Sequence, residues 1–166
     1  MARNFYIPSA ALKYFKRLNA HSKSGKIGRN MEFWWLCAQV GLLKNDSSRK
    51  VEDANDMVAH LDLLNPSQSR IRGVLLMEYI NAVKIGSSPP PRDLVEEVMQ
   101  SLFTDETASS LTEEGQKTLD KYAASGFELI EEEIGAQDEL KNFIRLYHQL
   151  VQDLVEERPV SSFSGS

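Results

Sequence analysis

Apolar residues recur every three or four positions along much of this chain, which is the spacing of an amphipathic helix. The pattern is clearest in residues 138–157, and it recurs in residues 10–20, 92–103 and 112–134. Within the last of these, Gly126 predicts that a neighbouring helix approaches closely, and Gly135 ends the segment. Each of the four helices is therefore expected to bury one stripe of side chains in a common core.

Two further expected helices, over residues 31–43 and 66–85, have little polar surface, the second from Ile71 to Ile85. The boundaries of the second are well marked, because Asn65 is a favourable cap, Pro66 suits the first helical position and Gly86 suits the end. A helix with little polar surface lies either at the centre of a bundle or in an interface.

The start of the chain is less regular. Residues 4–7 are apolar, aromatic and too few for a helix, so they are expected to be extended up to Pro8. Ser9 and Asn30 are the expected N-caps of the two helices that follow. A short helix is expected over residues 51–61.

Together these elements predict an all-α protein, a bundle of about six or seven helices with one short extended segment at its N-terminus. We expect a single domain over residues 1–158 and a disordered tail over residues 159–166. The proline-rich linker at residues 87–91 is stiff, and it leaves a division into two subdomains open.

Composition narrows the class of protein. A chain of 166 residues with 42% hydrophobic residues is long and apolar enough for one globular core. Its one cysteine, Cys37, excludes an intrachain disulfide and a multi-cysteine zinc site, and its place on an apolar stripe predicts a core position. No apolar run approaches the roughly 18 residues of a membrane helix, and no signal-like segment follows Met1. We therefore expect a cytoplasmic protein without a membrane partner.

The net charge of −5 conceals a gradient. Residues 1–31 contain seven basic side chains and no acid, residues 32–91 are nearly balanced, and residues 92–166 carry a net charge of −11. A locally basic segment favours an anionic partner such as DNA. The candidate DNA-contacting residues are Lys13, Lys16, Arg17, Lys23, Lys26 and Arg29. Alternatively, this arm packs on the acidic part of its own chain or on an acidic neighbouring subunit.

The sequence contains no catalytic motif. Asp56 and His60 are four positions apart and would share a face of the expected helix, but a metal site needs more converging ligands, so a solvated surface is the simpler interpretation. Glu131–Glu133 are consecutive and point in different directions around a helix. We expect no catalytic residue, no metal, no cofactor and no enzymatic activity.

The loop of residues 21–30 is rich in Gly, Ser and Lys but lacks the Gly-Lys-Ser/Thr of a phosphate-binding loop. Because it precedes a helix N-terminus, its unpaired amides remain candidates for a backbone contact to a phosphate. Trp34 and Trp35 would stack on bases, or they would lie in the core or at a subunit interface. We predict an interface with a protein partner.

Residues 4–43 have the order extended segment, helix, glycine-containing turn, helix, which is similar to the ribbon-helix-helix class of DNA-binding proteins. More narrowly, Ile7-Pro8-Ser9, the helix beginning Leu12-Lys13-Tyr14, and Gly28-Arg29-Asn30 before an apolar helix resemble the start of the DndE family. That family is the small helical DNA-binding component of bacterial phosphorothioate DNA-modification systems. The resemblance implies that the basic residues named above contact DNA.

The expected function is that of a non-enzymatic accessory subunit of a bacterial DNA-modification or phage-defence complex. Its basic N-terminal segment would contact the DNA backbone, and its acidic helical half would bind a larger protein subunit. The alternative is a purely structural subunit without nucleic-acid contact, which docks through the apolar faces of residues 31–43 and 138–157. A homo-oligomer is compatible with both.

Overall fold

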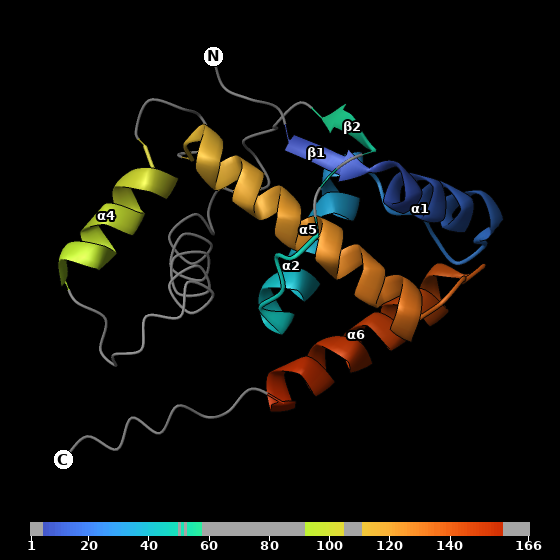
Figure 1. The fold of residues 1–166 in the computed structure, drawn as a ribbon. Coiled ribbons are helices and arrows are strands. Elements are labelled where there is room, and N and C mark those ends of the chain that lie inside the picture. Colours follow the sequence, from blue (N-terminus) through green and yellow to red (C-terminus); the bar gives the residue numbers. More distant parts are fainter. Residues whose placement is uncertain (1–4, 50, 52, 58–91, 105–110, 158–166) are drawn as a thin grey trace.

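The computed structural model describes residues 5–49, 51, 53–57, 92–104 and 111–157. These residues form five helices and a two-stranded ribbon, so the expectation of a mainly helical protein is confirmed for the described part of the chain (Figure 1). In chain order the elements are β1 (Phe5–Pro8), α1 (Ser9–His21), α2 (Asn30–Lys44), β2 (Ala54–Met57), α4 (Arg92–Leu102), α5 (Glu113–Glu133) and α6 (Leu140–Glu157). The expected helix at 66–85, the linker at 87–91 and the tail at 159–166 lie outside the described residues.

The contact between α2 and α5 is the most extensive in this part of the chain, and the two helices cross at the centre of the fold (Figure 1). Two glycines make it close. A Cβ atom on Gly126 would collide with the carbonyl of Cys37, and one on Gly41 would collide with the backbone of Tyr122. The close approach expected at Gly126 is therefore confirmed, with a second glycine on the facing helix.

Aromatic rings fill the core around this crossing. Phe15 of α1 stacks on Phe33 of α2 with ring centroids 4.8 Å apart, and Phe143 of α6 meets Phe15 edge-on at 5.6 Å. On the other side of α2, Phe5 of β1 lies 4.6 Å from Trp34. Two sets of rings thus meet on α2, one that joins it to α1 and α6 and one that joins it to β1, because each element presents its buried stripe to α2.

The ribbon replaces part of a predicted helix. Residues 54–57 form strand β2, paired antiparallel with β1 in the register Phe5↔Met57 to Pro8↔Ala54, so the helix expected over 51–61 is wrong at these positions. Phe5 and Ile7 are fully buried, and the edge of a buried strand needs partners for its backbone groups. The pairing extends one step further, since the amide of Ser9 donates to the carbonyl of Asp53.

Two predicted N-caps are displaced by one residue. Pro8 occupies the cap position of α1, and Ser9 is the first helical residue, with its hydroxyl bonded to Asp53 at 2.9 Å. Arg29 occupies the cap position of α2, one residue before Asn30. The expected start of the longest helix is confirmed, because the hydroxyl of Thr112 accepts from the amide of Gly115 at 3.1 Å.

Helix α6 packs against α2, and its side chains Phe143, Leu150 and Leu154 are buried. The hydroxyl of Tyr147 donates to the carbonyl of Leu36 at 2.9 Å and so fastens the middle of α6 to α2. None of the helices in the described ranges combines the length and the apolar character that a bilayer crossing requires.

Candidate nucleic-acid interface

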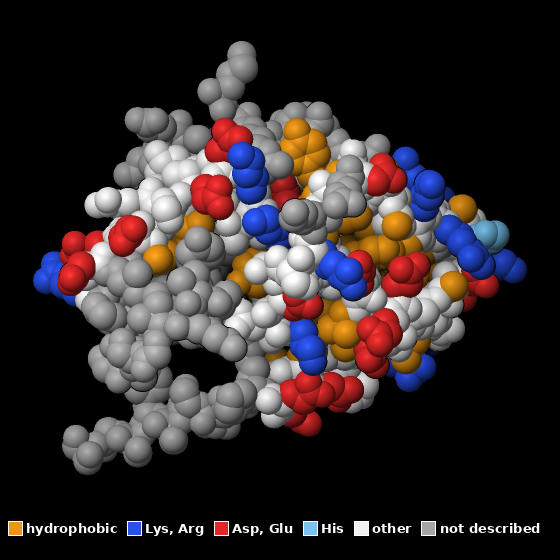
Figure 2. Space-filling view, in the orientation of Figure 1, with side chains coloured by type: hydrophobic (Ala, Val, Ile, Leu, Met, Phe, Trp, Pro, Cys, Tyr) orange, Lys and Arg blue, Asp and Glu red, His pale blue; other side chains and the backbone are white. Residues whose placement is uncertain are grey.

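All six candidate DNA-contacting side chains are exposed. Three project from α1, whose opposite face buries Ala11, Phe15 and Leu18, and three project from the loop of residues 22–29 that joins α1 to α2. We call this surface the basic end, and its members are Lys13, Lys16, Arg17, Lys23, Lys26 and Arg29. Figure 2 shows Lys and Arg side chains gathered at that end of the molecule, around α1 and the loop.

Hydrogen bonds within the chain hold the loop in place. The side chain of Asn19 donates to the carbonyl of Ile27 at 2.8 Å and accepts from the amide of Ile27 at 2.9 Å. The carboxylate of Glu32 accepts from the amides of Gly28 and Arg29 at 2.9 and 3.3 Å. A carboxylate thus occupies the place where a phosphate would meet the helix N-terminus, so the backbone contact that the sequence left open is excluded at these two amides.

A second set of bonds joins the loop to the start of α6. The carboxylate of Glu139 accepts from the amides of Lys23 and Ser24, at 3.1 and 3.2 Å, and from the hydroxyl of Ser24 at 3.0 Å. We call this arrangement the clasp, and its members are Ser22, Ser24, Glu139 and the backbone amides that they bind.

The clasp is reciprocal. The hydroxyl of Ser22 accepts from the amide of Leu140 at 3.0 Å, and that of Ser24 accepts from the amide of Lys141 at 3.1 Å. These two amides open α6 and have no partner within the helix, so the loop supplies caps that the local sequence does not. Donation by the Ser24 hydroxyl and the Lys23 amide holds the pKa of Glu139 below its usual range, which favours the charged form of that carboxylate.

Acidic side chains border the basic end. Arg17 lies 3.5 Å from Asp138, and both side chains are more than half exposed, at 58% and 67%. Such a pair contributes about 0–1 kcal/mol to folding. Glu131–Glu133 are also exposed, at the end of α5. Within the described part of the chain, Arg17 is the one member of the basic end whose side chain forms an ion pair. The clasp also joins the loop to the acidic part, through backbone amides and serine hydroxyls, so the alternative of packing on the chain's own acidic part is met there without use of the other five cations.

Tyr14 joins α1, the helix that carries three cations of the basic end, to the turn that follows α5. Its hydroxyl donates to the carbonyl of Gly135 at 2.6 Å, and its ring lies against Phe127 and Phe143. Burial is the main reason that the pKa of Tyr14 rises to about 12, with the charge of Glu131 adding to it. The tyrosine is therefore a structural tie and stays protonated at neutral pH.

The tryptophans divide into two environments. Trp34 is fully buried and donates its indole N–H to the carboxylate of Asp120 at 3.0 Å, so neither a stacked base nor a protein partner reaches it. The interface predicted at Trp34 is thus wrong, because an apolar helix surrounded by other elements turns its largest side chain inward. Trp35 is half-buried against Trp34, and its interface role stays a prediction.

Asp120 was not identified from the sequence, although it is a buried carboxylate in the middle of α5. Besides Trp34, it accepts from the backbone amide of Tyr6 at 3.1 Å and so ties the free edge of β1 to α5. A signal was present, because Asp120 lies four residues after the buried Gln116 and three before the buried Ala123, on the inward stripe of the helix.

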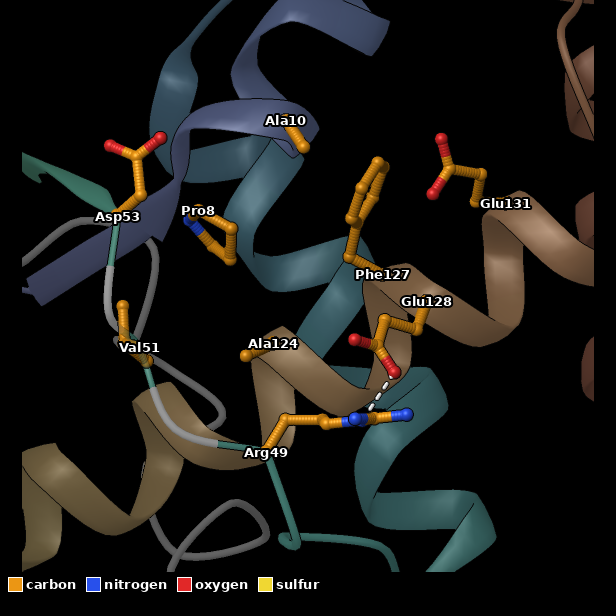
Figure 3. A pocket seen from close by; sticks show the side chains of 9 residues that line it. All are labelled: Pro8, Ala10, Arg49, Val51, Asp53, Ala124, Phe127, Glu128 and Glu131. Carbon is orange, nitrogen blue, oxygen red and sulfur yellow. Dashed lines mark ion pairs between the residues drawn. The ribbon is translucent and has the colours of Figure 1, made fainter.

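A shallow cavity of about 210 Å³ lies between the start of α1, residues 49–53 and α5 (Figure 3). Its apolar lining comes from Pro8, Ala10, Val51, Ala124 and Phe127, and its charged lining from Arg49, Asp53, Glu128 and Glu131. The guanidinium of Arg49 is paired with Glu128, as the dashed line in Figure 3 marks. Three carboxylates and one paired cation disfavour a phosphate, which leaves the basic end as the candidate anion site.

The structure removes the geometric basis for a metal site at Asp56 and His60. Asp56 belongs to strand β2, so the helical spacing that would bring it to His60 does not exist at that residue, and His60 lies outside the described residues. Across the described ranges, no three His, Cys, Asp or Glu residues form a group that would hold a metal ion. The predicted core position of Cys37 is confirmed, and burial raises the pKa of its thiol.

No family model, curated protein or solved structure matches this chain. The resemblance of residues 4–43 to the DndE family therefore stays a prediction. The functional argument below rests on charge, exposure and hydrogen bonding.

Proposed function

We propose that this chain is a non-enzymatic accessory subunit that binds the phosphate backbone of DNA through the basic end. The observation that carries the proposal is the exposure of all six basic side chains of one short segment at one end of a protein whose net charge is −5. The setting of a bacterial DNA-modification or phage-defence complex rests on the resemblance of residues 4–43 to the DndE family alone.

The chemistry of the basic end favours backbone contacts over base recognition. Its side chains are lysines and arginines on a helix surface and on a loop, which neutralise phosphates and carry no sequence information by themselves. The amides of Lys23, Ser24, Gly28 and Arg29 are already bonded within the chain, so we expect affinity to come from the side chains. We expect strong salt dependence and little sequence preference.

The burial of aromatic rings in the described part of the chain favours duplex DNA over a single strand as the ligand. Every aromatic side chain in the described part of the chain is buried or half-buried, and Tyr14, beside the cations of α1, is fixed by its bond to Gly135. Proteins that bind single strands combine basic grooves with exposed aromatic side chains on which bases stack. Duplex DNA offers a regular row of phosphates and needs no such platform.

The second candidate function is a structural subunit that binds only protein. It is favoured by Ile144 and Val155, which are 55% and 53% exposed on α6 and lie eleven positions apart, about three helical turns, on one face. In the proposed accessory role the same face is available to a protein partner. The two candidate functions therefore differ in whether DNA binds at all.

Binding of fluorescent duplex and single-stranded DNA at several salt concentrations tests the proposal. We expect the wild type to bind duplex more tightly, with affinity that falls steeply as salt rises. Replacing Lys13, Lys16 and Arg17 together by Glu should abolish retention of DNA.

A matched control makes this result specific. The triple variant Arg92→Glu, Lys117→Glu and Lys121→Glu changes the net charge equally on exposed residues of α4 and α5, and it should bind nearly as well as the wild type. Unchanged binding by the variant of α1 would contradict the proposal. A wild type that binds no DNA at low salt would favour the protein-binding subunit.

A further inference from the structure

We infer that the phosphate-binding surface is built from two segments of the chain, and that Lys141 and Arg145 of α6 form the second. This inference rests on the proposed function. It adds two cations from residues 92–166, the part of the chain whose net charge is negative. It follows from the clasp, which brings the start of α6 against the basic loop.

The two segments are in direct contact. The amide of Lys141 lies 3.1 Å from the hydroxyl of Ser24, so the backbone of Lys141 lies beside the loop between Lys23 and Lys26. The side chain of Leu140 packs on Gly25, where an added Cβ would come within 3.2 Å of it. In Figure 1 the end of α1, the loop and the start of α6 meet at the same end of the molecule.

The cations of α6 face outward. Phe143, Leu150 and Leu154 are buried, whereas Lys141 and Arg145 are exposed and one helical turn apart. His148 continues the same exposed row.

The charge at the start of α6 differs in sign from the net charge of the C-terminal part of the chain. Residues 140–152 contain Lys141 and Arg145 and no acidic residue, although the region from 92 to the C-terminus carries a net charge of −11. Residues 21–29 and 138–148 together carry three net positive charges. Two acids lie between the segments, and both are engaged within the chain, Asp138 with Arg17 and Glu139 in the clasp. A polyanion at this end therefore meets a surface with a positive net charge, which Glu131–Glu133 border at the end of α5.

The salt dependence of duplex binding tests the inference. The variant Lys141→Ala plus Arg145→Ala should lower the slope of log affinity against log salt by about two, because each lost phosphate contact removes about 0.9. At low salt we expect at least a tenfold loss of affinity. The matched control, Arg92→Ala plus Lys121→Ala, removes the same charge from exposed residues elsewhere and should keep the wild-type slope.

The outcomes separate the two claims. If the wild type binds with a steep slope and the variant of α6 has an unchanged slope, the inference is wrong and the proposed function stands. If neither the wild type nor the control binds duplex DNA, the proposed function fails and the inference fails with it.

A second measurement uses the unaltered chain and so avoids any effect on folding. Lysine acetylation with and without duplex DNA should show protection of Lys23, Lys26 and Lys141, while Lys117 and Lys121 react equally in both conditions. Equal modification of Lys141 alongside a protected Lys23 would overturn the inference.

Discussion

The contact between α2 and α5 and the clasp between the loop and α6 hold the same chain together by opposite means. The first is buried and apolar, with Gly41 and Gly126 letting two backbones touch. The second is largely exposed and consists of hydrogen bonds from serine hydroxyls and backbone amides around one carboxylate, Glu139.

The two regions differ in the substitutions that they can tolerate. A close-packed contact resists any added atom, because neighbouring backbone has nowhere to move. A polar contact at the surface contributes little to global stability, since water competes for the same groups. The proposed binding side chains are carried by the second kind of region, so substitutions there should change local order and binding before they change folding.

The largest effect on stability is expected at the helix contact. Gly126→Val would push side-chain atoms into the carbonyl of Cys37, and we expect the free energy of unfolding to fall by about 3 kcal/mol or more. Chemical denaturation followed by circular dichroism measures it. Gly28→Ala is the control, because the nearest atom to its added Cβ is 3.5 Å away, and it should stay within about 0.5 kcal/mol of the wild type. Equal stability of the two variants would contradict the close contact.

An intermediate effect is expected at the buried carboxylate. Asp120→Ala leaves the indole N–H of Trp34 and the amide of Tyr6 without their acceptor, which should cost about 2–3 kcal/mol in unfolding free energy. The matched control is Asp153→Ala, since Asp153 is exposed on α6 and its carboxylate accepts from the side chain of Gln149 on the same helix. A loss at Asp120 no greater than at Asp153 would show that the carboxylate does not tie β1 to α5.

The smallest effect on stability, and the most local, is expected at the clasp. Glu139→Ala removes the acceptor of the Lys23 and Ser24 amides, and we expect these two amides to exchange with solvent about tenfold faster while the core is unchanged. Amide hydrogen exchange by NMR measures it. Glu132→Ala, also exposed, is the control. Exchange at the two amides that is identical in both variants would contradict the clasp.

Acid titration of Glu139 is a second test of the clasp. The pKa of Glu139 is lower in the folded chain than in the unfolded one, so the clasp is complete above the usual pKa of glutamate and is lost as the pH falls through the lowered value. The NMR shifts of the Lys23 and Ser24 amides should therefore titrate below that usual value and should not titrate in Glu139→Ala. Titration at or above the usual value would contradict the direction of the shift.

The individual helices were largely predictable, for a local reason. Periodicity places α1, α2, α4, α5 and α6 within one or two residues of their observed ends, and α5 is capped by Thr112, the residue at which the sequence predicts that helix to begin. Two of the errors lie where a distant contact competes with a local preference. Residues 54–57 pair with the buried β1, and this pairing extends to Pro8, which takes the cap position expected at Ser9. The shift from Asn30 to Arg29 is local, because the carboxylate of Glu32 binds the amide of Arg29.

The candidate surface was predictable in part. The exposure of Lys13, Lys16 and Arg17 follows from their places opposite the apolar stripe of α1. The burial of Trp34 was not predictable, because a helix that is apolar all round has no polar face to orient it. In the structure the indole N–H of Trp34 points inward and donates to Asp120 on α5.

By itself, the sequence determined which segments are helical, which of their faces are apolar and where basic side chains are concentrated, because these properties depend on neighbours within a few residues. The tertiary structure alone decided that α6 joins the basic loop. Ser24 and Lys141 are 117 positions apart, and each is an ordinary polar residue in its own segment. Their contact forms because the packing of α6 against α2 brings the unpaired amides of one helix to the hydroxyls of a remote loop, and no local pattern encodes that distance.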